Sequence, residues 1–253
     1  MTPTEHATLQ AALSAFGAVG GGPRVLVVWQ VVRRGLGVEG LDALETERVS
    51  RLRRVDDRDR YLTAHHLARR VLGEYLGCAP SEVAFDRTCA RCGEQHGAPR
   101  VTGPAGRTGV AAVSGVSRLL SGTGLPSVSL THSGEIVGVA LGRGGPVGLD
   151  VEEPWPDDRE AQLADMVRAP GDDPGVGLRE LWVAKEAVLK ASGLGLAATM
   201  TEVALKGRHA EFSGRPWWWA PVPIANQPGY AAAVAAPGEP PDAVHLVTID
   251  AQE

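Results

Sequence analysis

Residues 182–190 read Trp182-Val-Ala-Lys-Glu-Ala-Val-Leu-Lys190, and Ala191-Ser-Gly-Leu-Gly195 follows. This pattern predicts a helix over residues 178–192 that ends at a glycine pair, because glycine readily adopts the left-handed C-cap conformation. The stretch holds two of the chain's three lysines, whereas arginine supplies almost all the other positive charge. Lysine and arginine differ in shape and hydration, so the choice predicts a need for ammonium groups. Glu186 and Lys190 share a helix face with Trp182, which by itself is typical of an exposed ion pair.

The composition favours an ordinary globular protein. A chain of 253 residues is long enough to bury a core as one large domain or two smaller halves. The net charge of -5 does not indicate a nucleic-acid-binding protein. We find neither an apolar run long enough for a membrane span nor a signal peptide, and three cysteines argue against a disulfide framework. We therefore expect a soluble, cytoplasmic protein.

The first third of the chain is predicted to be mainly helical. Residues 5–16 form a short predicted helix, residues 24–32 a buried strand, and residues 39–72 a helical region. Arginines are frequent in this last region and acidic residues are interleaved with them. Two interpretations are open: a salt-bridged, solvated helix face, or an anion site in which some of the arginines bind phosphate.

A cysteine motif follows a short predicted strand at residues 83–85. It reads Cys89-Ala-Arg-Cys92-Gly-Glu-Gln-His96-Gly, so two thiols and an imidazole are available as zinc ligands, with Cys78 as a further candidate. The chain has no second CxxC. Both a structural zinc site and a reduced, loop-forming cysteine pair fit this pattern.

Three consecutive strands of one sheet are predicted over residues 127–133, 136–141 and 147–152. His132, at the end of the first of these, is either a hydrogen-bonded structural histidine or a functional one. Asp150 and Glu152 are two residues apart, so their carboxylates point to the same face of the third strand. A divalent cation would relieve their repulsion, and oxygen ligands favour magnesium or manganese. An exposed strand end is the alternative.

The rest of the chain is predicted to contain a short amphipathic helix at residues 159–167 and, after the 178–192 helix, five strands. The run Trp217-Trp218-Trp219 would expose a ring on one face of its strand unless another element covers it. The predicted strands are 202–205, 210–212, 217–222, 230–235 and 244–249.

A weak internal repeat indicates two halves. Residues 133–151 and 228–249 each contain a strand, a Gly/Pro turn and a second strand. We therefore predict two related α+β halves that meet face to face, residues 1–145 and 146–253.

Three segments together resemble the Sfp-type 4'-phosphopantetheinyl transferases, in the order and near the spacing of that family. They are Leu130-Thr-His132-Ser, Gly148-Leu-Asp150-Val-Glu152, and Trp182-Val-Ala-Lys185-Glu186-Ala-Val-Leu-Lys190 with the glycines after it. The resemblance extends from about Arg48 to the C-terminus. The last two motifs are specific in combination, although either alone is weak.

The resemblance implies a fold and a reaction. The fold is an α+β pseudo-twofold pair of similar halves with the active site in the cleft between them. The enzyme transfers 4'-phosphopantetheine from coenzyme A to a serine of an apo acyl or peptidyl carrier protein and releases 3',5'-ADP. The length favours the Sfp type, a monomer, and carrier proteins of polyketide or nonribosomal peptide assembly lines as partners, with neither nucleic acid nor membrane.

The resemblance also implies residue roles. Asp150, Glu152 and Glu186 would bind Mg2+, and Lys190 would contact a phosphate of coenzyme A. Glu186 is also the candidate general base for the serine hydroxyl, directly or through a metal-bound water, and we leave these two roles open. Lys185 lies off the face of Glu186 and Lys190, and it is assigned either a structural role or a supporting position behind the residues that contact the ligands. Contacts to the coenzyme A phosphates are assigned to Thr131, His132, Arg48, Arg58 and Arg60.

One departure from the family pattern stands out. The family often has Gly-Lys-Pro ahead of the histidine motif, whereas this chain has Gly97-Ala98-Pro99, and Arg91 or Arg100 would have to compensate. Two other classes of function are therefore kept: a non-catalytic coenzyme A-binding or carrier-docking protein, and a zinc-dependent module.

Overall fold

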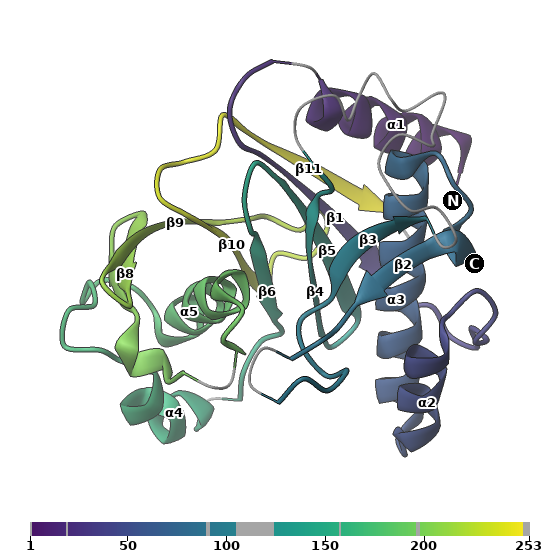
Figure 1. Cartoon of the computed structure of the whole chain (residues 1–253). Coiled ribbons are helices and arrows are strands. Elements are labelled where there is room, and N and C mark those ends of the chain that lie inside the picture. Colours follow the sequence, from purple (N-terminus) through teal and green to yellow (C-terminus); the bar gives the residue numbers. More distant parts are fainter. Residues whose placement is uncertain are drawn as a thin grey trace.

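The computed structural model describes residues 2–18, 20–89, 92–104, 124–156, 158–195 and 198–249 (Figure 1). Within these ranges, no helix combines the length and the apolar content that crossing a bilayer requires. Two short 3-10 turns, Pro80–Glu82 and Met200–Glu202, accompany the longer elements. The helices and strands are, in chain order, α1 (Pro3–Gly17), β1 (Arg24–Val31), α2 (Ala43–Arg51), α3 (Val55–Leu76), β2 (Val83–Asp86), β3 (Arg100–Pro104), β4 (Ser127–Ser133), β5 (Ile136–Arg143), β6 (Gly148–Glu152), α4 (Arg159–Val167), α5 (Leu178–Ser192), β7 (Ala204–Lys206), β8 (His209–Phe212), β9 (Arg215–Pro221), β10 (Ala231–Pro237) and β11 (Ala243–Ile249).

Two sheets form the centre of the molecule (Figure 1). The first has the order β11-β1-β5-β4, in which β1 and β11 are parallel and the other pairs antiparallel. The second has the order β6-β10-β9-β8-β7 and is antiparallel throughout. Strands β2 and β3 form a separate two-stranded hairpin.

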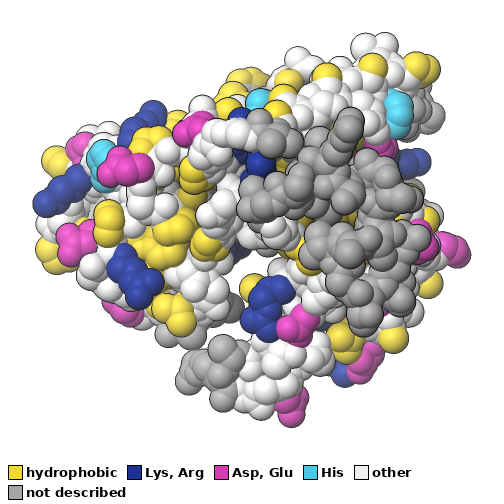
Figure 2. Space-filling model, turned by 45° about the horizontal axis from the view of Figure 1, so that its top comes forward, with side chains coloured by type: hydrophobic (Ala, Val, Ile, Leu, Met, Phe, Trp, Pro, Cys, Tyr) yellow, Lys and Arg dark blue, Asp and Glu magenta, His cyan; other side chains and the backbone are white. Residues whose placement is uncertain are grey.

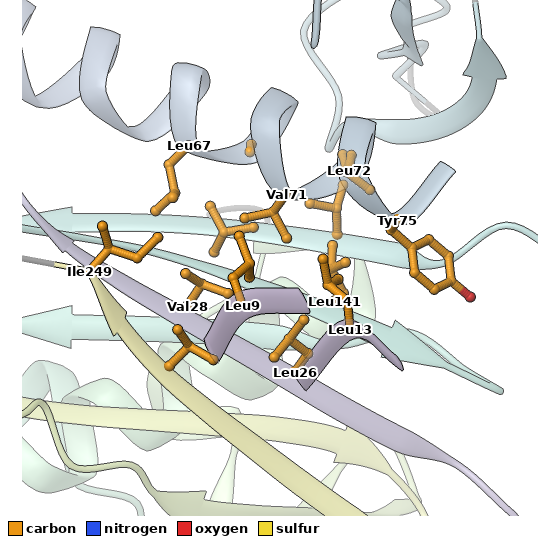
Figure 3. Close-up of a cluster of buried hydrophobic side chains, with 14 of the residues drawn as sticks. Leu9, Leu13, Leu26, Val28, Leu67, Val71, Leu72, Tyr75, Leu141 and Ile249 are labelled. Carbon is orange, nitrogen blue, oxygen red and sulfur yellow. The ribbon is translucent and has the colours of Figure 1, made fainter. Parts of the chain in front are cut away.

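The two sheets and their helices form layers with three hydrophobic cores. Figure 3 shows the first core, where Leu9 of α1 and Val71 of α3 pack on Val28 of β1. The second core lies between α5 and the outer face of the second sheet, and includes Val188 and Trp219. The third joins the inner faces of both sheets. This mixed arrangement of helices and sheets confirms the predicted α+β class.

The partner of β6 differs from the sequence-based prediction. We expected residues 127–152 to form three consecutive strands of one sheet, but β6 leaves the β4–β5 hairpin and pairs with β10 in the second sheet. The reverse exchange occurs at the end of the chain, where β11 follows β10 and pairs with β1 in the first sheet. Each sheet therefore contains one edge strand whose preceding strand belongs to the other sheet. Strand β11 lies within the range that we predicted as the second half.

The tryptophan run is buried on both faces of β9. Trp217 and Trp219 pack in the core beneath α5, and Trp218 packs in the core between the sheets. Their exposed fractions are 6%, 8% and 1% in chain order. No ring is left for solvent because the second sheet is covered on both sides.

A buried ionic cluster joins α2, α3 and the segment after β2. The Glu45 carboxylate is 1% exposed and accepts hydrogen bonds from Arg69 Nε at 2.8 Å and from Arg87 Nη2 at 2.6 Å. His65 Nδ1 lies 2.9 Å from the same carboxylate. Arg69 also donates to Asp42 at 2.9 Å. Arg69 is therefore salt-bridged, as one interpretation of the arginine-rich region held, but it is buried and not on a solvated helix face.

Lys185 has the structural role that we assigned to it. Its side chain is fully buried, and its Nζ donates to Asp172 Oδ2 and to Val167 O, both at 2.6 Å. Asp172 also accepts hydrogen bonds from the backbone N–H groups of Ala169 and Leu205. Because an unpaired buried ammonium is costly, this pair fixes the segment between α4 and α5.

Candidate functional site

The site lies where α5 crosses β6. Gly148 begins β6, and a Cβ placed there would come within 1.9 Å of Ala187 O and 2.7 Å of Ala191 N. Only glycine permits this approach of helix to strand. The crossing brings α5, which carries Glu186 and Lys190, beside the strand that carries Asp150. The glycine of the Gly-x-Asp-x-Glu motif is therefore a packing residue that positions the others.

Strand β4 faces β6 through a ladder of hydroxyl groups. Strand β6 lies at the edge of its sheet, where backbone N–H groups need partners from outside the sheet. Ser129, Thr131 and Ser133 of β4 supply them, since all three point to one side of the strand. Their Oγ atoms accept hydrogen bonds from the N–H groups of Leu149 at 3.1 Å, Val151 at 3.2 Å and Glu153 at 3.0 Å.

This ladder joins the two sheets directly beside the acidic motif. We predicted Thr131 as a phosphate contact. In the structure its hydroxyl donates a hydrogen bond to Asp150 Oδ1 at 3.2 Å. Ser129 and Ser133 were not assigned a role. The sequence pattern that could have indicated their role is a hydroxyl residue at every second position of residues 127–133, which gives the strand one polar face.

Lys190 binds Asp150 in the described structure. Its Nζ lies 2.7 Å from Asp150 Oδ1 and donates to Leu149 O at 3.0 Å. The distance to Thr131 Oγ1 is 3.4 Å. The Lys190 side chain is about one quarter exposed, at 28%, so it is not sealed in the core. It therefore anchors the acidic motif and remains open to an anion.

Three carboxylates, one of them in this ion pair and two beside it, have raised pKa values. Burial raises the pKa of Asp150 against the opposing charge of Lys190. Burial also raises the pKa of Glu152 and of Glu186, and the negative charge of Asp150 contributes to both. Trp155 Nε1 donates to Glu152 at 3.1 Å, which partly offsets the effect. A positive charge in addition to Lys190 would stabilise the ionised forms of all three.

The donor set fits a hard divalent cation. Asp150 Oδ2 is buried and has no hydrogen-bond partner among the described residues, which is costly for a carboxylate oxygen. Carboxylate oxygens are the ligands that magnesium prefers. The oxygens of Asp150, Glu152 and Glu186 do not form a closed three-ligand group within 4.8 Å. The described residues contain one group that does, and it consists of Cys89, Cys92 and His96.

His132 and Arg60 form the basic side of the site. His132 is solvent-exposed, but its pKa is lowered. The largest cause is the desolvation of the ring by nearby protein atoms, followed by the positive charges of Lys190 and Arg60. Arg60 is 19% exposed, and it donates to Gly134 O at 3.2 Å and to Asp57 at 2.6 Å. His132, Arg60 and Lys190 can each carry a positive charge, and a cluster of such groups is suited to bind phosphate.

The other predicted anion contacts are less closely placed. Arg48 and Arg58 are exposed on α2 and α3, and neither joins the hydrogen bonds around Asp150 in the part of the chain that is described. Ala98 is exposed in the segment before β3. Arg100 is paired with Asp86 at 2.7 Å, which lowers the pKa of that carboxyl, and Arg91 lies outside the described residues.

The described surface carries charges of both signs. Figure 2 shows lysines and arginines in small groups among acidic side chains on the face that it presents, rather than in one continuous basic field.

Comparison with known proteins confirms the resemblance to phosphopantetheinyl transferases. No family model matches the chain. A curated protein of Synechocystis sp., named "Putative 4'-phosphopantetheinyl transferase", is 27% identical over 173 residues. The match covers 64% of this chain and 61% of that protein, so the chain spans about three fifths of its relative. The relationship concerns the family as a whole and not the Sfp type in particular.

The acidic cluster predicts a pH-dependent effect of magnesium on stability. Because the pKa values of Asp150, Glu152 and Glu186 are raised, the metal-free folded state holds protons more tightly than the unfolded chain. The free energy of unfolding then falls as the pH rises from the ordinary carboxyl pKa values through these raised values. Magnesium bound by these carboxylates would compete with the protons, so calorimetry should show a larger increase in Tm at about pH 7 than at about pH 5. An equal increase at both pH values, or none, would contradict the site.

Proposed function

We propose that this protein transfers the 4'-phosphopantetheine group of coenzyme A to a serine hydroxyl of an apo carrier protein and releases 3',5'-ADP. The observation that carries the proposal is the crossing of α5 over β6 at Gly148, which gathers Asp150, Glu186 and Lys190. These are the motif positions through which the chain resembles the family. The curated relative supports the same activity.

We also propose that the fold is a pseudo-twofold pair of halves, residues 1–145 and 146–253, with the site in the cleft between them. The sheet compositions support this, since β1, β4 and β5 of the first range share one sheet and all strands of the other sheet come from the second range. Strand β11 is the exception, because it belongs to the second range and pairs with β1 of the first. The β4–β6 ladder then lies at the junction of the halves. Two halves within one chain favour an Sfp-type monomer.

Asp150, Glu152 and Glu186 are the residues that would hold Mg2+. The unpartnered Asp150 Oδ2 is the observation in favour of such a site. Bound there, the cation would supply positive charge to the pyrophosphate of coenzyme A as the phosphoanhydride bond breaks. The charge of Lys190 favours the ionised form of Asp150 and its ammonium group orients that carboxylate, so a phosphate contact by Lys190 would come in addition to this role.

The remaining residues bind coenzyme A and move a proton. Arg60, His132 and Thr131 lie on the side of the site where its phosphates would bind, and Arg48 and Arg58 extend this basic surface on α2 and α3. A phosphate beside His132 would favour its protonated form. Glu186 accepts the proton of the carrier serine hydroxyl as the serine oxygen attacks phosphorus. Its raised pKa suits a general base at neutral pH.

A transfer assay tests the proposal. The purified protein is incubated with coenzyme A, Mg2+ and a panel of apo acyl and peptidyl carrier proteins, including polyketide and nonribosomal peptide carriers. We expect a mass gain of one phosphopantetheine on a carrier and loss of that gain when the carrier serine is replaced by alanine or the metal is chelated. Binding of coenzyme A without a mass gain on any carrier would favour the non-catalytic alternative, to which Ala98 points.

A further inference from the structure

A second cluster of metal-ligating side chains lies outside the proposed active site, in the loop between β2 and β3. The Sγ atoms of Cys89 and Cys92 and a ring nitrogen of His96 lie within 4.8 Å of one another. Cys92 Sγ is 2.9 Å from His96 Nε2. None of the three cysteines is in a disulfide. Two thiols and an imidazole that converge in this way are a ligand set for a soft or borderline metal.

The backbone of the loop holds these ligands together. The N–H of Cys89 donates to Glu94 O at 2.7 Å, and the N–H of Gly93 donates to Cys89 O at 2.9 Å. Gly93 has a φ of 79°, a left-handed conformation that glycine adopts without strain. The chain thus turns back immediately after Cys92 and returns His96 to the two cysteines.

Hydrogen bonds also join the two ends of the loop, where the chain leaves β2 and where it approaches β3. The N–H of Gly97 donates to Arg87 O at 2.7 Å, and a Cβ at Gly97 would come within 3.0 Å of both Arg87 O and Thr88 O. Gln95 fastens the two sides, because its amide donates to Thr88 Oγ1 at 2.8 Å and accepts from Arg87 N at 3.2 Å. The described ends of the loop are therefore fastened to each other close to the ligand set.

We propose that Cys89, Cys92 and His96 form a zinc site with three protein ligands. Tetrahedral zinc with ordinary bond lengths requires about 3.8 Å between two sulfurs and about 3.5 Å between sulfur and nitrogen. The Cys92–His96 distance of 2.9 Å would have to lengthen by about 0.6 Å on metal binding. The other ligand distances are at most 4.8 Å, which small side-chain movements can adjust. Both thiols lose their protons on binding, and those protons pass to solvent.

The fourth position of the metal faces solvent. The part of the chain that the structure describes offers no fourth His, Cys, Asp or Glu in this group, and Cys92 and His96 are exposed. A water molecule therefore completes the tetrahedron. The metal cross-links the β2–β3 loop, whose Arg87 reaches the buried Glu45. The site does not depend on the proposed transferase activity.

Cobalt titration tests the proposal without an activity assay. Metal-free protein in a non-thiol reductant is titrated with Co2+, followed by Zn2+ in competition. We expect thiolate-to-cobalt charge-transfer bands and tetrahedral d–d bands that saturate at one equivalent and are bleached by zinc. Cys92→Ser should raise the dissociation constant for cobalt by more than about 100-fold, which exceeds the usual cost of losing an outer-shell partner.

The chain provides a matched control in Cys78, which is outside the cluster. Cys78→Ser should bind cobalt like the wild type, whereas His96→Ala should keep the charge-transfer bands and bind more weakly. Zinc should also protect Cys89 and Cys92, but not Cys78, from alkylation in the wild-type protein, as read by peptide mass spectrometry. The proposal fails if the wild type shows no saturable bands, if Cys92→Ser and Cys78→Ser behave alike, or if zinc protects no thiol.

Discussion

Glu186→Gln is expected to lower kcat for phosphopantetheine transfer by at least about 100-fold, because general base catalysis typically contributes that much or more. The substitution replaces a carboxylate by a neutral amide of the same shape. The Glu186 carboxylate accepts no hydrogen bond from the described residues, so no such bond is lost. The substitution also relieves repulsion with Asp150 and Glu152 in the metal-free protein. The free energy of unfolding should therefore stay unchanged or rise slightly, and steady-state transfer assays with urea unfolding measure both quantities.

Glu211→Gln is the matched control, since Glu211 is an exposed glutamate of β8. Magnesium titration separates the two roles of Glu186: excess Mg2+ should restore transfer if the residue acts mainly as a ligand. If it acts as the base, magnesium does not restore transfer, and the acidic limb of the pH–rate profile, where protonation of Glu186 lowers the rate, disappears. A Glu186→Gln variant with near-wild-type kcat would show that the role is wrong.

Glu45→Gln is expected to produce the largest loss of stability. Burial alone would raise the pKa of Glu45, but the hydrogen bond and charge of His65, with the charge of Arg69, lower it to about 2. A lowered pKa stabilises the fold above the ordinary glutamate value, and this contribution is lost as the pH falls from about 4.5 to about 2. The contribution at neutral pH is about 3 kcal/mol, in the range for breaking a buried ion pair.

The control for Glu45 lies on the same helix. Glu47 is 55% exposed and pairs with Arg51 one turn later, so Glu47→Gln should cost less than about 0.5 kcal/mol. Urea unfolding at neutral pH should separate the two variants by several kcal/mol, and between about pH 4.5 and 2 the difference should shrink as Glu45 itself becomes protonated. Equal urea midpoints would mean that the cluster does not stabilise the fold.

Much of the local structure was predictable from periodicity and breakers. The α4 and α5 boundaries agree with the predicted ranges, and the strands after α5 occur in the predicted order. These elements depend on apolar spacing and on nearby glycine and proline, which the sequence displays directly. The cysteine motif was also visible, but its convergence with His96 needed the backbone hydrogen bonds of the loop.

Contacts between distant segments were harder to predict. Lys190 was assigned to a phosphate because the family resemblance implies that role, and nothing local in the sequence shows that Asp150 lies 2.7 Å away. The arginines of α2 and α3 looked alike in the sequence. Only packing separates buried Arg69 from exposed Arg48 and Arg58.

By itself, the sequence determined the α+β class, the order of the elements and the spacing of the Gly148–Glu152 and Trp182–Lys190 motifs. Only the tertiary structure decided that β6 pairs with β10 and that β11 returns to β1. Strand pairing uses backbone hydrogen bonds, which are the same for every residue. A strand's partner therefore depends on which faces are already covered, as the burial of all three tryptophans of β9 illustrates.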